Sequence, residues 1–188
     1  PIYYQKKFNY QLVCDEHQIL SLLPDTLITR LFYKIWAIPI NYLIKNNKLK
    51  VIGVSNQSCE LISNVYNIPQ QSIHNIPLGA DTSLFRPDPI LRKRTRAELN
   101  IKDNEIIVIY TGRINYEKNP AILLEACYPI AKKLNIKFIF IGSLDPNYSS
   151  RFNKLSEGIE IIVFDTVLNT ELPKYYNAAD IACWPKHT

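Results

Sequence analysis

Short apolar runs alternate along the chain with longer stretches in which apolar residues recur every three or four positions. Short runs bounded by polar residues are typical of buried parallel strands, and the longer spacing is typical of amphipathic helices. In the first half, the pattern predicts a helix over residues 27–43, interrupted near Pro39, and another that begins after Ser55, a good capping residue. The strands predicted in this half span residues 11–14, 51–54 and 73–76.

The second half repeats this alternation more regularly. Its predicted strands span residues 105–110, 136–141, 159–164 and 180–184. The predicted helices lie between them, at residues 119–134, 147–156 and 170–178. Because strands that alternate with helices form parallel sheets joined by right-handed crossovers, the sequence predicts an α/β fold with a parallel sheet in each half.

The stretch of residues 77–104 differs from both halves. It holds four proline and glycine residues close together, followed by the basic run of residues 92–96. Such a change of composition is typical of a domain boundary. We therefore predict a first domain at residues 1–84, a linker at residues 85–103 and a second domain at residues 104–188. The basic run is predicted to form a solvated helix face.

Composition and charge narrow the class of protein only slightly. A hydrophobic share of 47% and a charged share of 21% are those of a globular chain and exclude a disordered one. The 22 Lys and Arg residues exceed the 17 Asp and Glu residues and give a net charge of +5. This mild excess favours anionic partners such as phosphates, and it gives no reason to predict nucleic-acid binding.

The cysteines and the apolar stretches exclude several kinds of site. The four cysteines, Cys14, Cys59, Cys127 and Cys183, form no CxxC pair, so neither a zinc site nor a redox motif is predicted. Each has apolar neighbours, which predicts buried free thiols in a reducing cytoplasm.

The most membrane-like stretch, residues 35–44, is far shorter than the roughly 20 residues that span a bilayer.

Residues that follow the predicted strands are the first candidates for chemistry, because ligands of open α/β sheets bind beyond the carboxyl ends of the strands. After residues 105–110 come Gly112, which lets a backbone approach a ligand, and Arg113, whose planar fork suits phosphate oxygens. Lys118 adds a charge near the predicted start of the next helix, whose own positive end faces the same way. Three positive sources are expected to converge there on an anion.

The order of several segments resembles family 4 of the retaining glycosyltransferases, which have the GT-B fold. The matching segments, from about residue 51 to the end, are IPLGADTSLFRPDP, AELNI, IIVIYTGRINYEKNPAILLEAC, KFIFIGS and ELPKYYNAADIACWP. The resemblance implies parts of two Rossmann-like domains with parallel sheets. Residues 1–84 would belong to the acceptor-side domain and residues 104–188 to the domain that binds the nucleotide-sugar donor.

The resemblance also implies roles for individual residues. Arg113 and Lys118 would hold the donor's diphosphate and stabilise the leaving group in place of a metal ion, with no cofactor. Gly142 and the backbone of Val167 and Asn169 would border the nucleotide base. His17 matches a strand-end histidine that faces the donor sugar in the family; a histidine hydrogen-bonded within its own loop is the alternative interpretation.

The sequence departs from the family pattern at several positions. Leu78 replaces an asparagine in an interdomain turn, and Asp165 stands where glycine is common. A glycine-rich donor loop is expected before Pro1 and a glutamate pair after Thr188. Lys186 and His187 are weaker candidates, on their strand-end position alone.

The resemblance thus implies a metal-independent retaining glycosyltransferase that moves a sugar from a nucleotide diphosphate sugar to a glycan or lipid-linked acceptor. A role in polysaccharide biosynthesis is expected, in the cytoplasm or at the membrane surface, where residues 27–50 resemble an interfacial helix. The 188 residues alone are expected to bind donor weakly without turnover. The alternatives are a non-catalytic fragment or homologue that binds a nucleotide or a partner, and a GT-B sugar-nucleotide epimerase.

Overall fold

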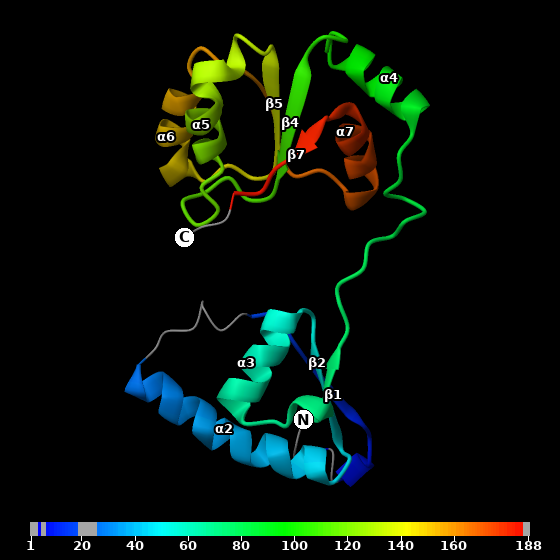
Figure 1. Ribbon diagram of the computed structural model, residues 1–188, viewed down its shortest axis with the longest axis vertical. Coiled ribbons are helices and arrows are strands. Elements are labelled where there is room, and N and C mark those ends of the chain that lie inside the picture. The colour runs from blue at the N-terminus through cyan, green and yellow to red at the C-terminus, as the bar shows by residue number, and fades with distance from the viewer. Residues whose placement is uncertain (1–3, 5–6, 19–25, 186–188) are drawn as a thin grey trace. The chain divides into compact units, whose positions relative to one another are not determined.

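The computed structural model describes residues 4, 7–18 and 26–185 of the chain. It divides into two compact units, Pro1–Ala80 and Asp81–Thr188. Each unit is built on a parallel sheet flanked by helices (Figure 1). The α/β arrangement predicted from the apolar pattern is therefore present in both units.

The first unit has a sheet of three parallel strands in the order β1-β2-β3. Two helices and a short 3₁₀ turn connect the strands, and the apolar side chains between α2, α3 and the sheet form a small core around Leu43, Val51 and Ile62. The elements are β1 (Leu12–Glu16), α2 (Leu27–Lys45), β2 (Leu49–Gly53), α3 (Asn56–Tyr66), η2 (Gln70–Ser72) and β3 (Ile73–Asn75). All three predicted strands are confirmed.

The two helices of this unit differ in how well they were predicted. Ser55 caps α3 as expected, because its side chain accepts a hydrogen bond from the amide of Ser58. The predicted interruption of α2 is wrong, since the helix continues through Pro39 to Lys45. Proline removes the hydrogen bond to the carbonyl four residues earlier, and that carbonyl belongs to the exposed Ile35.

The second unit has a sheet of four parallel strands in the order β6-β5-β4-β7. Its strands are β4 (Ile106–Thr111), β5 (Ile136–Ile141), β6 (Glu160–Phe164) and the short β7 (Ile181–Ala182). Its helices are α4 (Pro89–Glu98), α5 (Ala121–Ala131), α6 (Pro146–Ser156) and α7 (Leu172–Ala178), with the 3₁₀ turn η3 (Asn169–Glu171) before α7. The four strands and three later helices match the predicted order.

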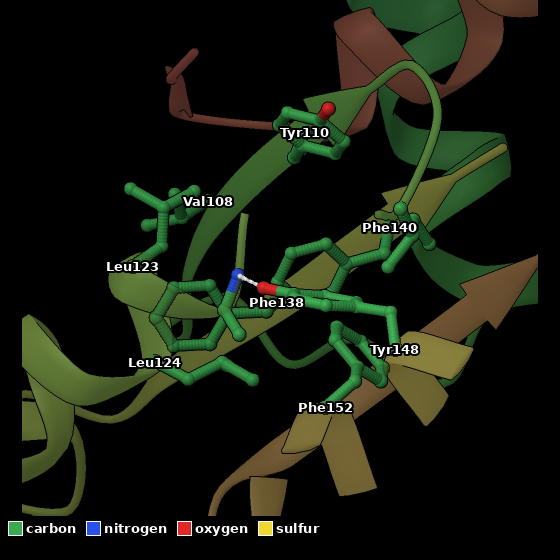
Figure 2. Packing of buried hydrophobic residues seen from close by; sticks show 10 residues of the cluster. Val108, Tyr110, Leu123, Leu124, Phe138, Phe140, Tyr148 and Phe152 are labelled. Carbon is green, nitrogen blue, oxygen red and sulfur yellow. Dashed lines mark hydrogen bonds between the residues drawn. The ribbon is translucent and has the colours of Figure 1, made fainter. Parts of the chain in front are cut away.

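Both faces of the inner strands β4 and β5 are buried, because apolar residues stand at nearly every position of these two strands. Val108, Tyr110, Phe138 and Phe140 pack against α5 and α6, as Figure 2 shows. Their neighbours Ile107, Ile109, Ile139 and Ile141 pack against the opposite layer, which includes Tyr175 of α7. Figure 1 shows α5 and α6 on one side of these strands and α4 and α7 on the other. Burying each such side chain contributes about 1.5–3 kcal/mol.

The predicted linker at residues 85–103 is wrong. The boundary between the units falls after Ala80, and most of the expected linker is α4, which packs on α7 within the second unit. Asp88 caps α4 by accepting a hydrogen bond from the amide of Leu91, and Pro89 fits the first helical position. The prolines that suggested a linker therefore include the first residue of a helix, Pro89.

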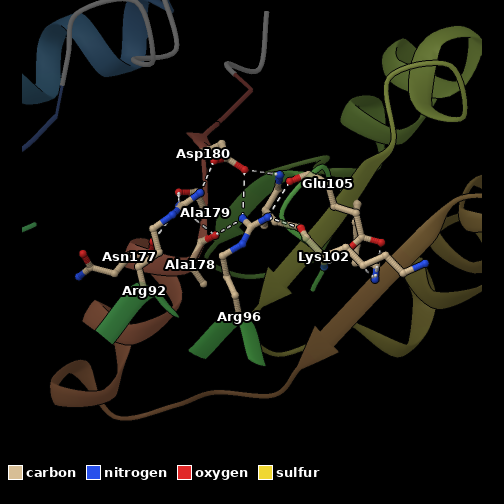
Figure 3. A network of polar contacts seen from close by, with 10 residues as sticks. Arg92, Arg96, Lys102, Glu105, Asn177, Ala178, Ala179 and Asp180 are labelled. Atoms are coloured by element: carbon tan, nitrogen blue, oxygen red, sulfur yellow. Dashed lines mark hydrogen bonds and ion pairs between the residues drawn. The ribbon is translucent and has the colours of Figure 1, made fainter. Parts of the chain in front are cut away.

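Two arginines attach α4 to the rest of the unit, so the basic run is not simply a solvated face (Figure 3). Arg96 is only 5% exposed and donates hydrogen bonds to the carbonyls of Ala178, Lys102 and Glu105. Arg92 donates to the carbonyls at the end of α7, residues 177–179. Both guanidinium groups also pair with the carboxylate of Asp180. The other three residues of the run include Arg94, which is exposed.

Asp180 joins this network to the sheet. Its carboxylate accepts a hydrogen bond from the amide of Ile107 at 2.7 Å, at the start of β4. Partial burial favours the neutral acid, but the hydrogen bonds from Ile107 and Arg92 outweigh it and lower the pKa of Asp180. The network thus connects α4, the end of α7 and the central strand.

The expectation of four buried cysteine thiols is met fully at one position only. All four are free thiols, and Cys59 is buried, but Cys14 is exposed on β1. Cys127 and Cys183 are half-buried.

We predict that Arg96→Met lowers the free energy of unfolding of the second unit by about 2–4 kcal/mol, because three carbonyls and a carboxylate lose their buried donor. Arg94→Met is the matched control, and an exposed i,i+4 pair with Glu98 is worth no more than about 0.5 kcal/mol. Urea unfolding in a Trp36→Phe background lets the fluorescence of Trp184 report the second unit alone. Equal losses in the two variants would contradict the role assigned to Arg96.

Candidate functional site

Two glycines bring the first two loops at the carboxyl edge of the larger sheet into direct contact. Gly112 follows β4 with φ of +140°, and Gly142 follows β5 with φ of +146°. A Cβ atom on Gly142 would overlap the carbonyl group of Gly112 and lie 3.5 Å from the amide nitrogen of Arg113. Only glycine fits at residue 142, for backbone angle and for space alike.

Hydrogen bonds extend the sheet pattern through both glycines. The amide of Gly112 donates to the carbonyl of Ile141, and the amide of Gly142 donates to the carbonyl of Phe164. One step further, Ile114 and Leu144 form an isolated parallel bridge. The loops after β4, β5 and β6 are thereby fixed in register with one another.

Arg113 lies at the exposed edge of this joined pair of loops. The hydroxyl of Tyr110, which is buried, donates a hydrogen bond of 2.8 Å to the carbonyl of Arg113 and holds its backbone. Within the part of the chain that the structure describes, no residue accepts a hydrogen bond from the Arg113 guanidinium. A fixed backbone and a solvent-facing guanidinium suit the binding of an anion.

Lys118 lies on a tight turn of the same loop. The side chain of Asn115 accepts a hydrogen bond from the amide of Lys118, and the carbonyl of Asn115 accepts one from the amide of Asn119. Asn119 closes the turn in a left-handed conformation with φ of +41°, which asparagine adopts more readily than most other residues with a side chain. The ammonium group of Lys118 pairs with Glu117 at 2.9 Å, and both side chains are more than half exposed. Such a pair is weak and leaves Lys118 able to exchange it for a phosphate.

The start of α5 differs from the expectation that its amides would face a ligand. The first three amides have acceptors within the chain: Tyr148 for Ala121, Asn119 for Ile122 and Pro120 for Leu123. The helix therefore contributes its dipole to the loop rather than free donors. Arg113 and Lys118 therefore remain as donors to an anion, and the helix end adds only its partial charge.

The predicted base-binding residues follow β6. Val167 is half-buried and packs against the cluster beneath α7, whereas Asn169 is exposed at the start of η3. Asp165, which occupies a position where glycine was expected, turns its carboxylate back to the amide of Thr166 at 2.6 Å. The loop thus has its own stable conformation without that glycine.

His17 belongs to the first unit, not to the unit that carries Arg113 and Lys118. It follows β1, is half exposed, and its Nε2 atom lies 2.9 Å from a carboxylate oxygen of Asp15. This hydrogen bond is the main reason why the pKa of Asp15 is lowered. His17 thus has the local hydrogen bond that the alternative interpretation predicted.

Sequence reasoning missed a group of polar and aromatic side chains beside Gly112. The hydroxyls of Thr111 and Tyr176 are 2.7 Å apart, and the indole of Trp184 donates to the carbonyl of Thr111. Thr111 and Trp184 both lie at strand ends, which was the only signal available. Lys186 and His187, which were weaker candidates, lie outside the described residues.

A hollow at the opposite edge of the sheet is a competing location for a ligand. It lies at the amino ends of the strands and is lined by residues that include Lys102, Glu105, Lys137 and Glu160. Lys137 is largely buried there and pairs with both carboxylates. Because Lys137 is already paired with two carboxylates, this hollow is less suited to bind an anion than the carboxyl edge is.

The part of the chain that forms this carboxyl edge matches a known protein family. The family model described as Glycosyl transferases group 1 matches residues 92–188. A D-inositol 3-phosphate glycosyltransferase of Segniliparus rotundus is 28% identical over 134 residues, which are 68% of this chain and 29% of that protein. An uncharacterized glycosyltransferase of Methanocaldococcus jannaschii is 24% identical over 153 residues, 78% of this chain and 38% of that protein. The matched parts of the chain thus cover 29% and 38% of these two relatives.

Two solved structures share the fold. HepE of Anabaena, solved in complex with UDP and glucose, superposes with a TM-score of 0.71 at 16% identity, over 96% of this chain and 48% of that one. WaaG, a glycosyltransferase involved in lipopolysaccharide biosynthesis, superposes with a TM-score of 0.67 at 15% identity, over 97% and 55% of the two chains. This likeness confirms the predicted GT-B type of α/β fold.

We predict that Gly142→Ala lowers the free energy of unfolding of the second unit by about 3 kcal/mol or more, because the methyl group adds an overlap to an unfavourable backbone angle. Gly158→Ala is the control, since Gly158 also has a positive φ, +77°, but a Cβ there meets only the Tyr128 hydroxyl at 4.0 Å. That variant should cost about 1–2 kcal/mol. Urea unfolding measures both, and similar costs would show that the contact between the two loops is not tight.

Proposed function

Because the chain belongs to the group 1 glycosyl transferases, we propose that it forms part of a retaining enzyme that transfers a sugar from a nucleotide diphosphate sugar to a glycan or lipid-linked acceptor. The observation that carries this proposal is the joined pair of loops after β4 and β5, which presents Arg113 and Lys118 at the ligand-binding edge of the sheet. This edge lies within the residues that match the family. The HepE complex with UDP and glucose supports a nucleotide-sugar donor by analogy.

Arg113 and Lys118 provide the charge that such a reaction requires. As the bond between the sugar and the diphosphate breaks, negative charge develops on the leaving nucleotide diphosphate. Prepositioned cations stabilise that charge more than they stabilise the bound donor, and this difference lowers the barrier. In this proposal the side chains of Arg113 and Lys118 bind the diphosphate, without a metal ion or cofactor.

The neighbouring loops suit the rest of the nucleotide. The backbone of Gly142 lies against the diphosphate loop, so a nucleotide that reaches Arg113 also passes Gly142. The loop after β6, with Val167 half-buried and Asn169 exposed, borders the base in this proposal. The backbone amides and carbonyls of this loop can form hydrogen bonds to the polar edge of a nucleotide base.

His17 is assigned to the sugar end of the donor, as a group contributed by the acceptor-side domain. Its hydrogen bond to Asp15 restrains the imidazole ring and favours one orientation. An imidazole held in this way can donate or accept a hydrogen bond at a sugar hydroxyl.

Two other functions remain as competitors. A non-catalytic nucleotide-binding homologue would bind the donor without transfer, and a GT-B epimerase would convert one sugar nucleotide into another. Product analysis with the full-length protein separates the three, because only the transferase joins the sugar to an acceptor. We place the reaction in the cytoplasm and in polysaccharide biosynthesis.

We predict that Arg113→Ala and Lys118→Ala in the full-length protein each reduce kcat for sugar transfer by about 30- to 1,000-fold, the usual effect of losing one group that stabilises transition-state charge. Lys133→Ala is the control, because Lys133 is an exposed lysine of the same unit beyond the end of α5. Steady-state kinetics with UDP-, GDP- and ADP-linked sugars provide the measurement. Unchanged transfer in both variants would exclude the proposed site.

A peripheral contact with an anionic membrane surface is the second part of the proposal. The 19-residue helix α2 buries only Ala37 and Leu43 and contains no acidic residue. It carries Arg30, Lys34 and Lys45, a charge that complements anionic lipid headgroups. Its exposed large apolar side chains are Leu27, Ile28, Leu31, Phe32, Ile35, Trp36, Ile38 and Tyr42. Among the described residues, no helix is long and apolar enough to cross a membrane.

We predict that the chain co-sediments with phosphatidylserine vesicles at low salt and that replacing Phe32 and Trp36 together by serine removes most of the binding. Loss of two inserted aromatic rings removes several kcal/mol of apolar burial, by the usual figure of about 1.5–3 kcal/mol per side chain. Tyr128→Ser removes an equally exposed ring from the second unit and should leave binding unchanged. A wild-type chain that stays in the supernatant, or that dimerises through α2 without lipid, would contradict this contact.

A further inference from the structure

A buried tyrosine from α6 contacts the loop that carries Lys118. Tyr148 has no exposed surface, and its hydroxyl forms two hydrogen bonds to residues near the start of α5. It accepts one from the amide of Ala121 at 3.1 Å, the dashed line in Figure 2, and donates one to the side-chain oxygen of Asn119 at 2.8 Å. Both partners lie within three residues after Lys118.

The ring of Tyr148 also contacts the residue on the other side of this turn. The ring of Tyr116 packs edge-on against it, with centroids 4.9 Å apart and an interplanar angle of 82°. Tyr148 thus contacts the loop two residues before Lys118 and one residue after it. The ring of Tyr148 belongs to the buried cluster between the sheet, α5 and α6, so these contacts connect the loop to that core.

The hydroxyl is suited to form both hydrogen bonds at once. Burial raises the pKa of Tyr148, so the group stays protonated at neutral pH and can always donate to Asn119. The same oxygen keeps a lone pair for the amide of Ala121. Asn119 needs such support, because its left-handed backbone is unfavourable for a residue with a side chain.

We propose that Tyr148 is a positioning residue for donor binding, which fixes the turn of residues 115–119 so that Lys118 is held ready for the diphosphate. This inference rests on the proposed function of the Arg113 and Lys118 loop. It adds a specific dependence: the contribution of Lys118 to binding requires the Tyr148 hydroxyl. A tyrosine that merely fills the core would show no such dependence.

The test compares a nucleoside diphosphate with its nucleoside, so that the diphosphate contribution is measured separately. Calorimetric titration of the 188-residue chain with UDP, GDP and ADP identifies the tightest diphosphate, which is then compared with uridine, guanosine or adenosine. Tyr148→Phe keeps the ring and its contact with Tyr116 but removes both hydrogen bonds. Tyr175→Phe, a buried tyrosine on the opposite face of the sheet, is the matched control.

We expect Tyr148→Phe to weaken binding of the diphosphate about five- to tenfold, the usual range for lost hydrogen bonds, and to leave binding of the nucleoside unchanged. In a Lys118→Ala background the same substitution should have no further effect, because the two residues act as one unit. Asn119→Gly removes the acceptor but keeps the backbone angle, and it should reproduce the loss; it replaces Tyr148→Phe if that variant does not fold.

Two different results would overturn the inference, and they can be told apart. Equal diphosphate binding by wild type and Tyr148→Phe, or equal losses for the diphosphate and the nucleoside, would show that Tyr148 is only structural while the proposed function stands. A wild-type chain that binds none of the three diphosphates would overturn the proposed function together with this inference.

Discussion

The contact between the backbones of Gly112 and Gly142 determines the shape of the carboxyl edge of the larger sheet. Neither loop could approach the other so closely with a side chain at residue 142. The approach lets each glycine amide reach the last carbonyl of the next strand, which keeps three loops in register. The backbone of Arg113 takes its position from this contact, so the candidate anion site is a consequence of strand geometry rather than of a flexible loop.

Buried polar contacts on the two faces of the sheet fix opposite ends of β4. On one face, the hydroxyl groups of Tyr110 and Tyr148 extend from the aromatic core to the loop of Arg113 and Lys118. On the other face, Arg96 and Asp180 connect α4, α7 and the start of β4 through hydrogen bonds that are largely shielded from water. The two tyrosine hydroxyls thus support the loop of Arg113 and Lys118, whereas the arginine network fixes α4 and α7 to the amino end of β4.

Much of the fold could be predicted from the sequence, because runs of β-branched and aromatic residues such as 106–109 and 138–141 favour buried strands. The start and the packing of α4 were missed because its capping residue, Asp88, stands between two prolines and its arginines look like surface charge. Their burial depends on carbonyls about 80 residues later in the chain. No local pattern contains that information.

The candidate site was predictable to a similar degree. Gly112 and Gly142 follow from the rule that loops after parallel strands carry function, and the structure places them together. The occupied amides of α5 and the role of Tyr148 were not predictable, because they depend on a side chain from another helix that reaches this loop. The relation of His17 to the donor loop stays a prediction, since the two belong to different units.

The central claim is that a nucleoside diphosphate binds at the carboxyl edge of the larger sheet. It is tested most directly by mapping amide chemical-shift changes in the ¹⁵N-labelled chain during titration with UDP, GDP or ADP. The account predicts that the largest changes occur at Gly112, Arg113, Gly142 and Ser143, with little change at the amino ends of the strands. Changes concentrated around Lys102, Lys137 and Gly158 instead would contradict it and would place the ligand in the hollow at the opposite edge.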